Sequence, residues 1–252
     1  MKYFFITGTS RGLGEDVARQ LIAEDNYIFC IARQQNQQLV EMAQNKQNRL
    51  KNVAFDLNEL TELESMLEGL FAGIDLETAE GFYLINNAGT LDPIKPVGIA
   101  ESEAVIRNIN VNQLAPMLLT SAFVRLTKTV KCQRRVVNVS SGAGRKPYEG
   151  WSSYCAAKAA IDMFTRCVAL ESQLEENPTE IVAFGPGVMD TAMQAGIRNT
   201  NTADFVQLQK FLDLKKDGKL LTPELVAGVL IKLLLADNFP QGEYIDVYSL
   251  MA

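Results

Sequence analysis

Short apolar runs alternate along the chain with longer segments in which apolar side chains recur every three or four positions. The apolar runs are typical of buried strands, and the periodic segments are typical of amphipathic helices. Strands are predicted over residues 2–8, 27–33, 52–57, 81–89, 134–141, 180–187 and 243–250. Helices are predicted over residues 15–24, 36–48, 60–74, 101–130, 153–176 and 222–237.

The alternation of strands and helices indicates an α/β fold with a parallel sheet. Strands that are apolar at nearly every position suit a sheet covered on both faces. We predict one Rossmann-type domain over residues 1–252, with a doubly wound parallel sheet of about seven strands and helices on both faces. Ligands of such sheets bind beyond the carboxyl ends of the strands. The less regular stretch 190–221 is predicted to be a mobile substrate lid over that edge.

Composition and charge exclude several classes of partner. The 252 residues carry a formal net charge of −6, without the basic stripe expected of a nucleic-acid binder. The apolar runs are far shorter than the roughly 20 residues that a membrane span needs. No secretory leader is visible, so we expect a cytoplasmic protein without nucleic-acid or membrane partners. The four scattered cysteines are expected to be small buried hydrophobes in a reducing compartment.

The chain contains no histidine. This excludes every Ser–His–Asp mechanism and every histidine-ligated metal site, and we predict no metal. Acid–base chemistry must therefore come from carboxylates, lysine, tyrosine or cysteine.

The segment TGTSRGLG (7–14) joins the first predicted strand to the first predicted helix. Gly8, Gly12 and Gly14 allow a tight turn and a close approach of the backbone to a phosphate at the helix N-terminus. Its spacing differs from both GxGxxG and the P-loop, and a glycine-rich turn alone is often only a turn. Its position between a strand and an amphipathic helix nevertheless makes it a good dinucleotide candidate.

Arg33 follows the second predicted strand, where NAD-binding folds usually place an acidic residue. A second arginine, Arg11, lies in the glycine-rich turn. Two guanidiniums would bind a 2′-phosphate that an acid would repel, which favours NADP(H) over NAD(H). Alternatively, both arginines are ordinary surface charges.

Tyr154 precedes Lys158 by four residues in GWSSYCAAKAA (150–160). Residues at this spacing share one face of a helix. An ammonium beside a phenol would lower the pKa of the phenol and make it a usable acid near neutral pH. The alternative is an ordinary solvated helix.

The chain resembles the short-chain dehydrogenase/reductases over nearly its whole length. TGTSRGLG, NNAG (86–89), VNVSS (137–141), YCAAK (154–158) and PG (186–187) have the family's order and spacing. The resemblance implies a catalytic tetrad of Asn112, Ser141, Tyr154 and Lys158, with Ser140 as a less well spaced alternative to Ser141. In that tetrad Tyr154 donates a proton to the carbonyl oxygen, Ser141 binds the same oxygen, Lys158 holds the cofactor ribose and Asn112 holds a water.

The resemblance also implies where NADP(H) binds. One of the implied residues, Asp56, is weak evidence on its own, because an aspartate at the end of a strand often caps a helix. The implied cofactor contacts are Gly8, Ser10, Arg11, Gly12, Leu13, Gly14, Arg33, Asp56, Leu57, Asn87, Ala88, Gly89, Tyr154, Lys158, Pro186, Gly187, Val188, Met189, Asp190 and Thr191.

Within the family, GWSSYCAAKAAIDMF and PGVMDTAMQ (186–194) are similar to sepiapterin reductases and benzil reductases. The implied substrate contacts are Ser141, Trp151, Tyr154, Gly187, Met193 and Asp246. Asp246 matches an aspartate that anchors the pterin in sepiapterin reductases, or it simply faces solvent. Trp151, Met193 and Phe205 either line an apolar pocket or pack inside the lid.

The resulting hypothesis is an NADPH-dependent reductase of a ketone or 1,2-dicarbonyl as small-molecule substrate. One alternative is a dedicated sepiapterin reductase, and another is a non-catalytic sensor of NADP(H). The resemblance further implies a homodimer or homotetramer assembled through the helices at 101–130 and 153–176.

Overall fold

A computed structural model describes residues 1–45 and 48–251. Within them, one parallel sheet of seven strands has the order β3-β2-β1-β4-β5-β6-β7. The strands are β1 (Lys2–Thr7), β2 (Asn26–Ala32), β3 (Arg49–Ala54), β4 (Gly81–Asn86), β5 (Gln133–Val139), β6 (Glu180–Gly185) and β7 (Tyr244–Asp246). The order changes direction between β1 and β4, so the predicted doubly wound sheet is confirmed.

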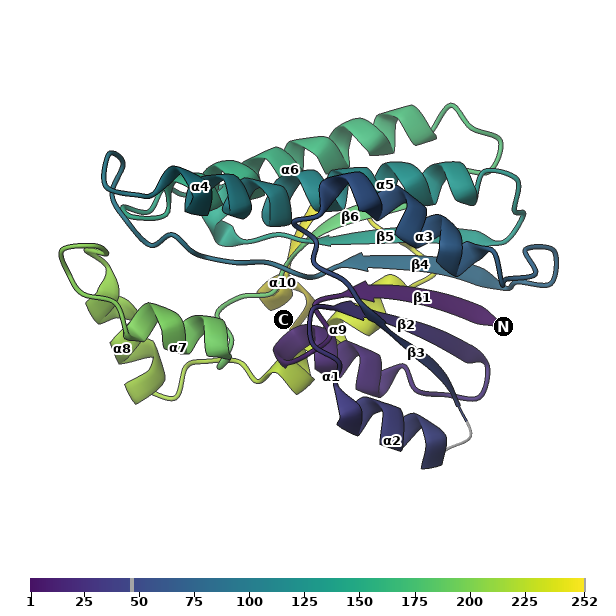
Figure 1. Cartoon of the computed structure of the whole chain (residues 1–252), viewed down its shortest axis with the longest axis horizontal. Helices are drawn as coiled ribbons and strands as arrows, with labels where there is room; N and C mark the ends of the chain where they lie inside the picture. Colours follow the sequence, from purple (N-terminus) through teal and green to yellow (C-terminus); the bar gives the residue numbers. More distant parts are fainter. Residues whose placement is uncertain (46–47, 252) are drawn as a thin grey trace.

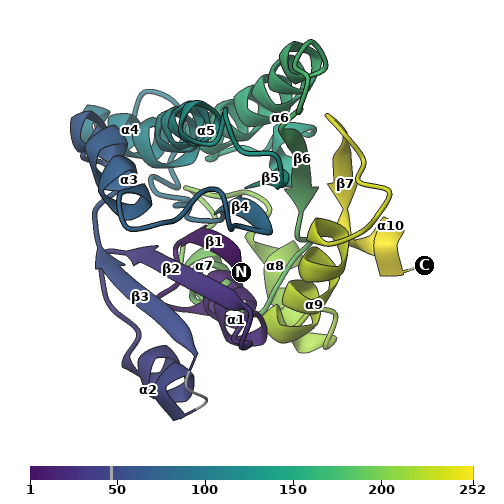
Figure 2. The ribbon, with the colours of Figure 1, turned by 90° about the vertical axis from the view of Figure 1, so that its right-hand side faces the viewer.

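Helices cover both faces of this sheet (Figures 1 and 2). One face carries α1 (Gly12–Gln20), α2 (Gln37–Asn45) and α9 (Pro223–Leu234). The other carries α3 (Leu63–Phe71), α4 (Ser102–Ile109), α5 (Ala115–Leu126) and α6 (Ser152–Ser172). Residues 46 and 47 of the helix predicted over 36–48 lie outside the described residues, as does residue 252. No described helix combines the length and the apolarity that crossing a bilayer requires.

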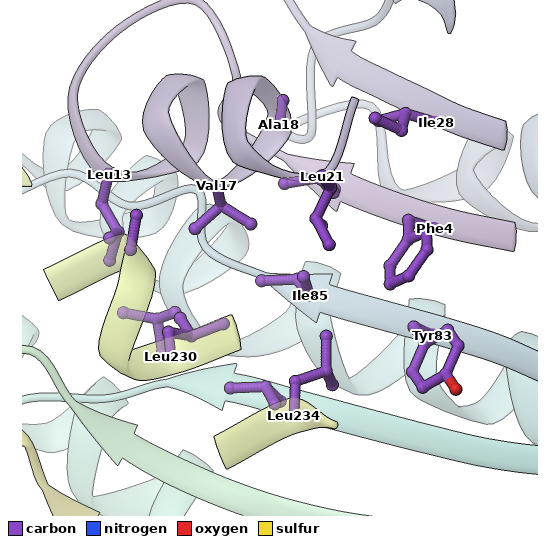
Figure 3. Packing of buried hydrophobic residues seen from close by; sticks show 14 of the residues in the cluster. Phe4, Leu13, Val17, Ala18, Leu21, Ile28, Tyr83, Ile85, Leu230 and Leu234 are labelled. Atoms are coloured by element: carbon purple, nitrogen blue, oxygen red, sulfur yellow. The ribbon is translucent and has the colours of Figure 1, made fainter. Parts of the chain in front are cut away.

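Each face of the sheet has its own hydrophobic core, because neighbouring residues of a strand point to opposite faces. On one face, Phe4 and Ile85 pack with Val17 of α1 and Leu230 of α9 (Figure 3). On the other, the ring of Phe5 stacks on Phe29 and Phe71 with centroid distances of 4.7 and 4.8 Å. Burial on both faces explains why the strands read as apolar runs.

The strand predicted over 243–250 is wrong in its second half. The strand β7 ends at Asp246, and a short helix, α10 (Val247–Met251), follows. The Asp246 carboxylate accepts a hydrogen bond from the Tyr248 backbone N–H at 3.0 Å. An aspartate in this position caps a helix N-terminus, so the local cap ends the strand.

The helix predicted over 101–130 is divided by a π-helical turn, Asn110–Leu114, between α4 and α5. Such turns occur frequently at functional sites, and this one carries Asn112.

The stretch 190–221 is more regular than predicted. It contains α7 (Ala192–Arg198) and α8 (Leu208–Lys216), which project beyond the carboxyl ends of the strands (Figure 1). The mobility of this lid remains a prediction.

Candidate active site

A cavity of about 1500 Å³ lies at the carboxyl ends of the strands, bounded by the glycine-rich turn, the loops after the strands and the lid. A space of this size exceeds the usual pocket for a single small molecule. Eighteen predicted site residues line it: Gly8, Ser10, Arg11, Gly12, Leu13, Arg33, Asp56, Leu57, Asn87, Ala88, Gly89, Tyr154, Lys158, Pro186, Met189, Asp190, Thr191 and Met193. Gly14, Asn112, Ser141, Trp151, Gly187, Val188 and Asp246 do not line it.

The glycine-rich turn is a cradle that has no room for side chains. Gly8 has φ of +74°, and a Cβ on it would lie 2.8 Å from the Ala88 Cα. A Cβ on Gly14 would lie 2.4 Å from the Gly8 carbonyl oxygen. The N-terminus of α1 therefore meets the cavity with bare backbone, which is the arrangement that binds a phosphate anion. These residues fit the diphosphate of a dinucleotide.

Replacing Gly14 with alanine is expected to destabilise the protein by about 1–3 kcal/mol, because the added methyl group meets rigid backbone. The displacement of α1 should also weaken binding of the cofactor. Gly69→Ala is the matched control, since Gly69 lies exposed within α3 and nothing lies within 4 Å of its added Cβ. It is expected to stabilise the helix by about 0.5–1 kcal/mol. Thermal unfolding and cofactor titration of the two variants measure the changes in stability and in binding. Equal stability of the two variants would contradict the conclusion that Gly14 has no room for a side chain.

Two guanidiniums stand at the edge of this cradle. Arg11 and Arg33 are exposed and line the cavity. Neither forms an ion pair with a carboxylate of the described residues, in contrast to Arg19, which pairs with Asp16 at 2.8 Å. Their charges are thus free for an anionic ligand.

Tyr154 and Lys158 lie one turn apart on α6 and both line the cavity. Their exposed fractions are only 7% and 5%. The Lys158 Nζ lies 5.7 Å from the centroid of the Tyr154 ring and donates a hydrogen bond to the Val139 carbonyl oxygen at 2.8 Å. The structure thus brings the phenol and the ammonium together on a nearly buried wall.

Burial determines the proton affinity of both groups. It raises the pKa of Tyr154 to about 12, and a hydrogen bond with the Ser141 side chain acts in the opposite direction. It lowers the pKa of Lys158 to about 8, against the attraction of the Asp162 carboxylate. The expectation that the pKa of Tyr154 falls below 10 is therefore wrong for the protein alone, because burial is the largest influence on this phenol.

Ser141 lies behind Tyr154 at the end of β5. Its Oγ accepts a hydrogen bond from the Ala143 backbone N–H at 3.1 Å, which starts the short helix η3 (Gly142–Gly144). This cap fixes the Ser141 hydroxyl, which acts to lower the pKa of the Tyr154 phenol.

Asn112 is fully buried and ties the π-helical turn to the loop after β4. Its Nδ2 donates to the Thr90 carbonyl oxygen at 2.7 Å and to the Asn108 Oδ1 at 3.0 Å. Its Oδ1 accepts from the Thr90 backbone N–H at 3.0 Å. The amide thus holds the cavity wall around Gly89 and Thr90, and its predicted water remains a prediction.

Trp151 and Phe205 belong to the packing of the lid. They stack with centroids 4.7 Å apart, and the ring of Phe211 completes the cluster. Phe205 is fully buried and Trp151 is 5% exposed. Of the three residues considered for an apolar pocket, Met193 reaches the cavity and the two aromatic residues support the lid from behind. The assignment of Trp151 as a substrate contact is therefore corrected.

Asp246, Gly187 and Val188 also lie away from the cavity wall. The Asp246 carboxylate caps α10 and accepts a hydrogen bond from the Tyr244 hydroxyl at 3.3 Å. A Cβ on Gly187 would lie 3.0 Å from the Tyr248 ring, so this residue packs against α10. The structure does not bring these three predicted contacts to the substrate space.

Sequence reasoning missed one wall of the cavity, the loop from Thr90 to Lys95. Lys95 forms an ion pair of 2.6 Å with Asp204 and thereby joins this loop to the lid. Its signal in the sequence is the run TLDPIKP directly after NNAG, which has the prolines of an ordered loop. No group of three or more possible metal ligands occurs among the described residues.

The chain is similar in sequence and in structure to known oxidoreductases. The family described as short chain dehydrogenase matches residues 2–202. Benzil reductase ((S)-benzoin forming) from Bacillus cereus is 47% identical over 247 residues, which cover 98% of this chain and 99% of that protein. Sepiapterin reductase from Bos taurus is 31% identical, with 97% and 93% covered. A short chain dehydrogenase/reductase from Saccharomyces cerevisiae superposes with a TM-score of 0.84 at 26% identity, with 99% and 98% covered.

Proposed function

The chain belongs to the short chain dehydrogenase family and is a carbonyl reductase that uses a nicotinamide cofactor; we propose that it transfers a hydride from NADPH to a ketone or 1,2-dicarbonyl, with Tyr154 as the general acid. The observation that carries this proposal is the nearly buried pair of Tyr154 and Lys158, facing the same cavity as the glycine cradle. A reduced nicotinamide bound in this cavity would supply the hydride.

Three side chains of this protein prepare the proton transfer. Tyr154 keeps its proton at neutral pH because burial raises its pKa to about 12, and an alkoxide is a strong enough base to take it. Ser141 would donate to the same oxygen and stabilise its developing charge. Lys158 would hold the cofactor's ribose hydroxyls and contribute positive charge beside the reacting oxygen.

The preference for NADPH rests on the two unpaired guanidiniums, Arg11 and Arg33, at the rim of the cradle. A 2′-phosphate gains charge-assisted hydrogen bonds there. No carboxylate follows β2 in the position where NAD-binding folds hold the ribose hydroxyls.

The substrate space favours an apolar, aryl-bearing carbonyl compound. Leu91, Ile94 and Met193 line it from the loop after β4 and from α7. The relative from Bacillus cereus is named as a benzil reductase, and benzil is a 1,2-dicarbonyl with two aryl groups. A dedicated sepiapterin reductase needs a free acceptor for the pterin, whereas the Asp246 carboxylate caps α10 outside the cavity wall.

A panel of carbonyl compounds assayed with NADPH and with NADH tests this proposal. We expect turnover of benzil and related 1,2-diketones, a clear preference for NADPH, and little turnover of sepiapterin. Asp246→Ala should leave benzil turnover unchanged. Tight NADPH binding without turnover of any carbonyl compound would contradict the proposal and favour a non-catalytic sensor of NADP(H). Selective turnover of sepiapterin by the wild type, with loss of this activity in Asp246→Ala, would favour a pterin reductase.

We further propose a cytoplasmic homodimer or homotetramer without nucleic-acid or membrane partners. The outer surfaces of α5 and α6 expose Leu118, Met163 and Leu170, with exposed fractions of 44%, 54% and 66%. All four cysteines are free thiols, which suits a reducing compartment.

A further inference from the structure

Asp162 stands beside the active-site side chains without a role in the proposed reaction. It follows Lys158 by one turn of α6 and therefore shares its helix face. Its Oδ1 accepts a hydrogen bond from the Ser140 Oγ at 2.5 Å. Ser140 is 1% exposed and lines the cavity. The Asp162 carboxylate thus contacts a residue of the cavity wall, Ser140.

The end of β5 is clamped to α6 at two consecutive residues. The Lys158 Nζ binds the Val139 carbonyl oxygen, and Asp162 binds the side chain of Ser140. The next residue is Ser141, whose side chain acts on the pKa of Tyr154. Loss of the Asp162 contact would therefore loosen the segment that places Ser141 against Tyr154.

The charged groups around Asp162 come from three elements. Burial raises the pKa of the Asp162 carboxyl, whereas the Ser140 hydrogen bond, Arg145 after η3 and Lys158 on α6 act in the opposite direction. The carboxylate also acts on Tyr244 of β7, whose ring lies 4.5 Å below the Arg145 guanidinium. Around Lys158, Asp162 is the carboxylate that opposes the effect of burial, and the amide of Asn112 on the π-helical turn carries no charge.

We propose that Asp162 is a positioning residue of this site: it places a negative charge on the helix face that carries Lys158 and, through Ser140, fixes the segment after β5 that carries Ser141. The role assigned to the ammonium rests on the proposed function, whereas the effect of Asp162 on Lys158 is a property of the protein alone. The proposed function and the proposed role of Asp162 can therefore be contradicted independently.

The sign of the effect follows from the environment of Lys158. Burial lowers the pKa of Lys158 to about 8, and the Asp162 carboxylate raises it. Removing this negative charge lowers the pKa further, so the ammonium is lost at a lower pH. If the reaction needs the ammonium, the alkaline limb of kcat/KM must move in the same direction.

Asp162→Asn tests the charge, because the amide oxygen can still accept the Ser140 hydrogen bond. Lysines labelled with ¹³C at the ε position are titrated by NMR, and the Lys158 signal is assigned by its loss in Lys158→Arg. We expect the midpoint of Lys158 to fall by about one pH unit or more, as for the loss of a neighbouring opposite charge. The limb of the kcat/KM profile for benzil should fall by the same amount.

Glu171→Gln is the matched control, since it removes the same charge from an exposed position on α6, roughly 20 Å along the helix from Lys158. It should leave the Lys158 midpoint in place. An unchanged midpoint in Asp162→Asn, or an equal shift in Glu171→Gln, would overturn the proposal.

Asp162→Ala removes both the charge and the hydrogen-bond acceptor. It should reproduce the shift of Asp162→Asn and lower kcat further, because the strand end is released. It also replaces Asp162→Asn in the titration if that variant fails to fold. If the Lys158 midpoint shifts but the protein reduces no carbonyl compound, the role of Asp162 is supported and the proposed function is contradicted. If the midpoint does not shift but the protein reduces benzil, the role of Asp162 is contradicted and the proposed function is supported.

Discussion

Replacing Tyr154 with phenylalanine is expected to lower kcat for carbonyl reduction by about 10²- to 10⁴-fold, the usual contribution of a positioned general acid. The variant removes one oxygen atom from a side chain that is 7% exposed and leaves the ring that packs against Trp151. The fold and the cavity should therefore persist. The measurement is the rate of NADPH oxidation at saturating benzil, with the affinity for NADPH measured separately by fluorescence titration.

The expected pattern separates chemistry from binding. The dissociation constant for NADPH should stay near that of the wild type, while kcat and kcat/KM fall together, because the lost interaction exists chiefly in the transition state. Tyr27→Phe is the control: Tyr27 lies on β2, packs on Tyr3 and Phe29, and does not line the cavity. It should retain full activity. Turnover of Tyr154→Phe within twofold of the wild type would remove Tyr154 from the proposed mechanism.

The raised pKa of Tyr154 gives the two directions of the reaction different pH dependences. Reduction needs the phenol, which is present at every pH well below about 12. Oxidation of the alcohol needs the phenolate, so its rate should rise with pH through the neutral range. The buried tyrosine thus suits a protein that works as a reductase.

Local patterns in the sequence were sufficient to predict the fold, and most of the residues predicted to contact the cofactor line one cavity. The apolar strands reveal the sheet because both faces are buried, as Phe4 and Phe5 show. The close packing at Gly8 and Gly14 could be predicted because only residues without a Cβ fit at these positions. Tyr154 and Lys158 could be paired because helix geometry alone places them on one face.

Features that depend on contacts distant in the sequence could not be predicted in this way. Trp151 packs on Phe205 only because the lid folds back over the start of α6. The sequence cannot show that burial raises the pKa of Tyr154, because desolvation is a property of the whole site. Asp162 reveals its role only when β5 brings Ser140 against it. The substrate half of the site is accordingly the half that the sequence describes least well.

Replacing Arg33 or Arg11 with alanine is expected to weaken NADPH binding and to leave NADH binding nearly unchanged. A hydrogen bond to a charged group contributes roughly 1.5–3 kcal/mol, and 1.4 kcal/mol corresponds to about a tenfold change in affinity. Each single variant should therefore raise the dissociation constant for NADPH by about 10- to 150-fold. The reason is local, because both guanidiniums line the cavity without a carboxylate partner among the described residues.

The comparison of the two cofactors makes this experiment specific for the 2′-phosphate, since NADPH and NADH differ only in that group. Fluorescence titrations of the wild type, Arg11→Ala and Arg33→Ala with both cofactors give the ratio of affinities directly. Arg166→Ala is the control, because Arg166 is exposed on α6 and does not line the cavity. Equal losses for NADPH and NADH would mean that the arginines bind the diphosphate shared by both cofactors. An unchanged affinity for NADPH in both variants would contradict the proposal that Arg11 and Arg33 bind the 2′-phosphate.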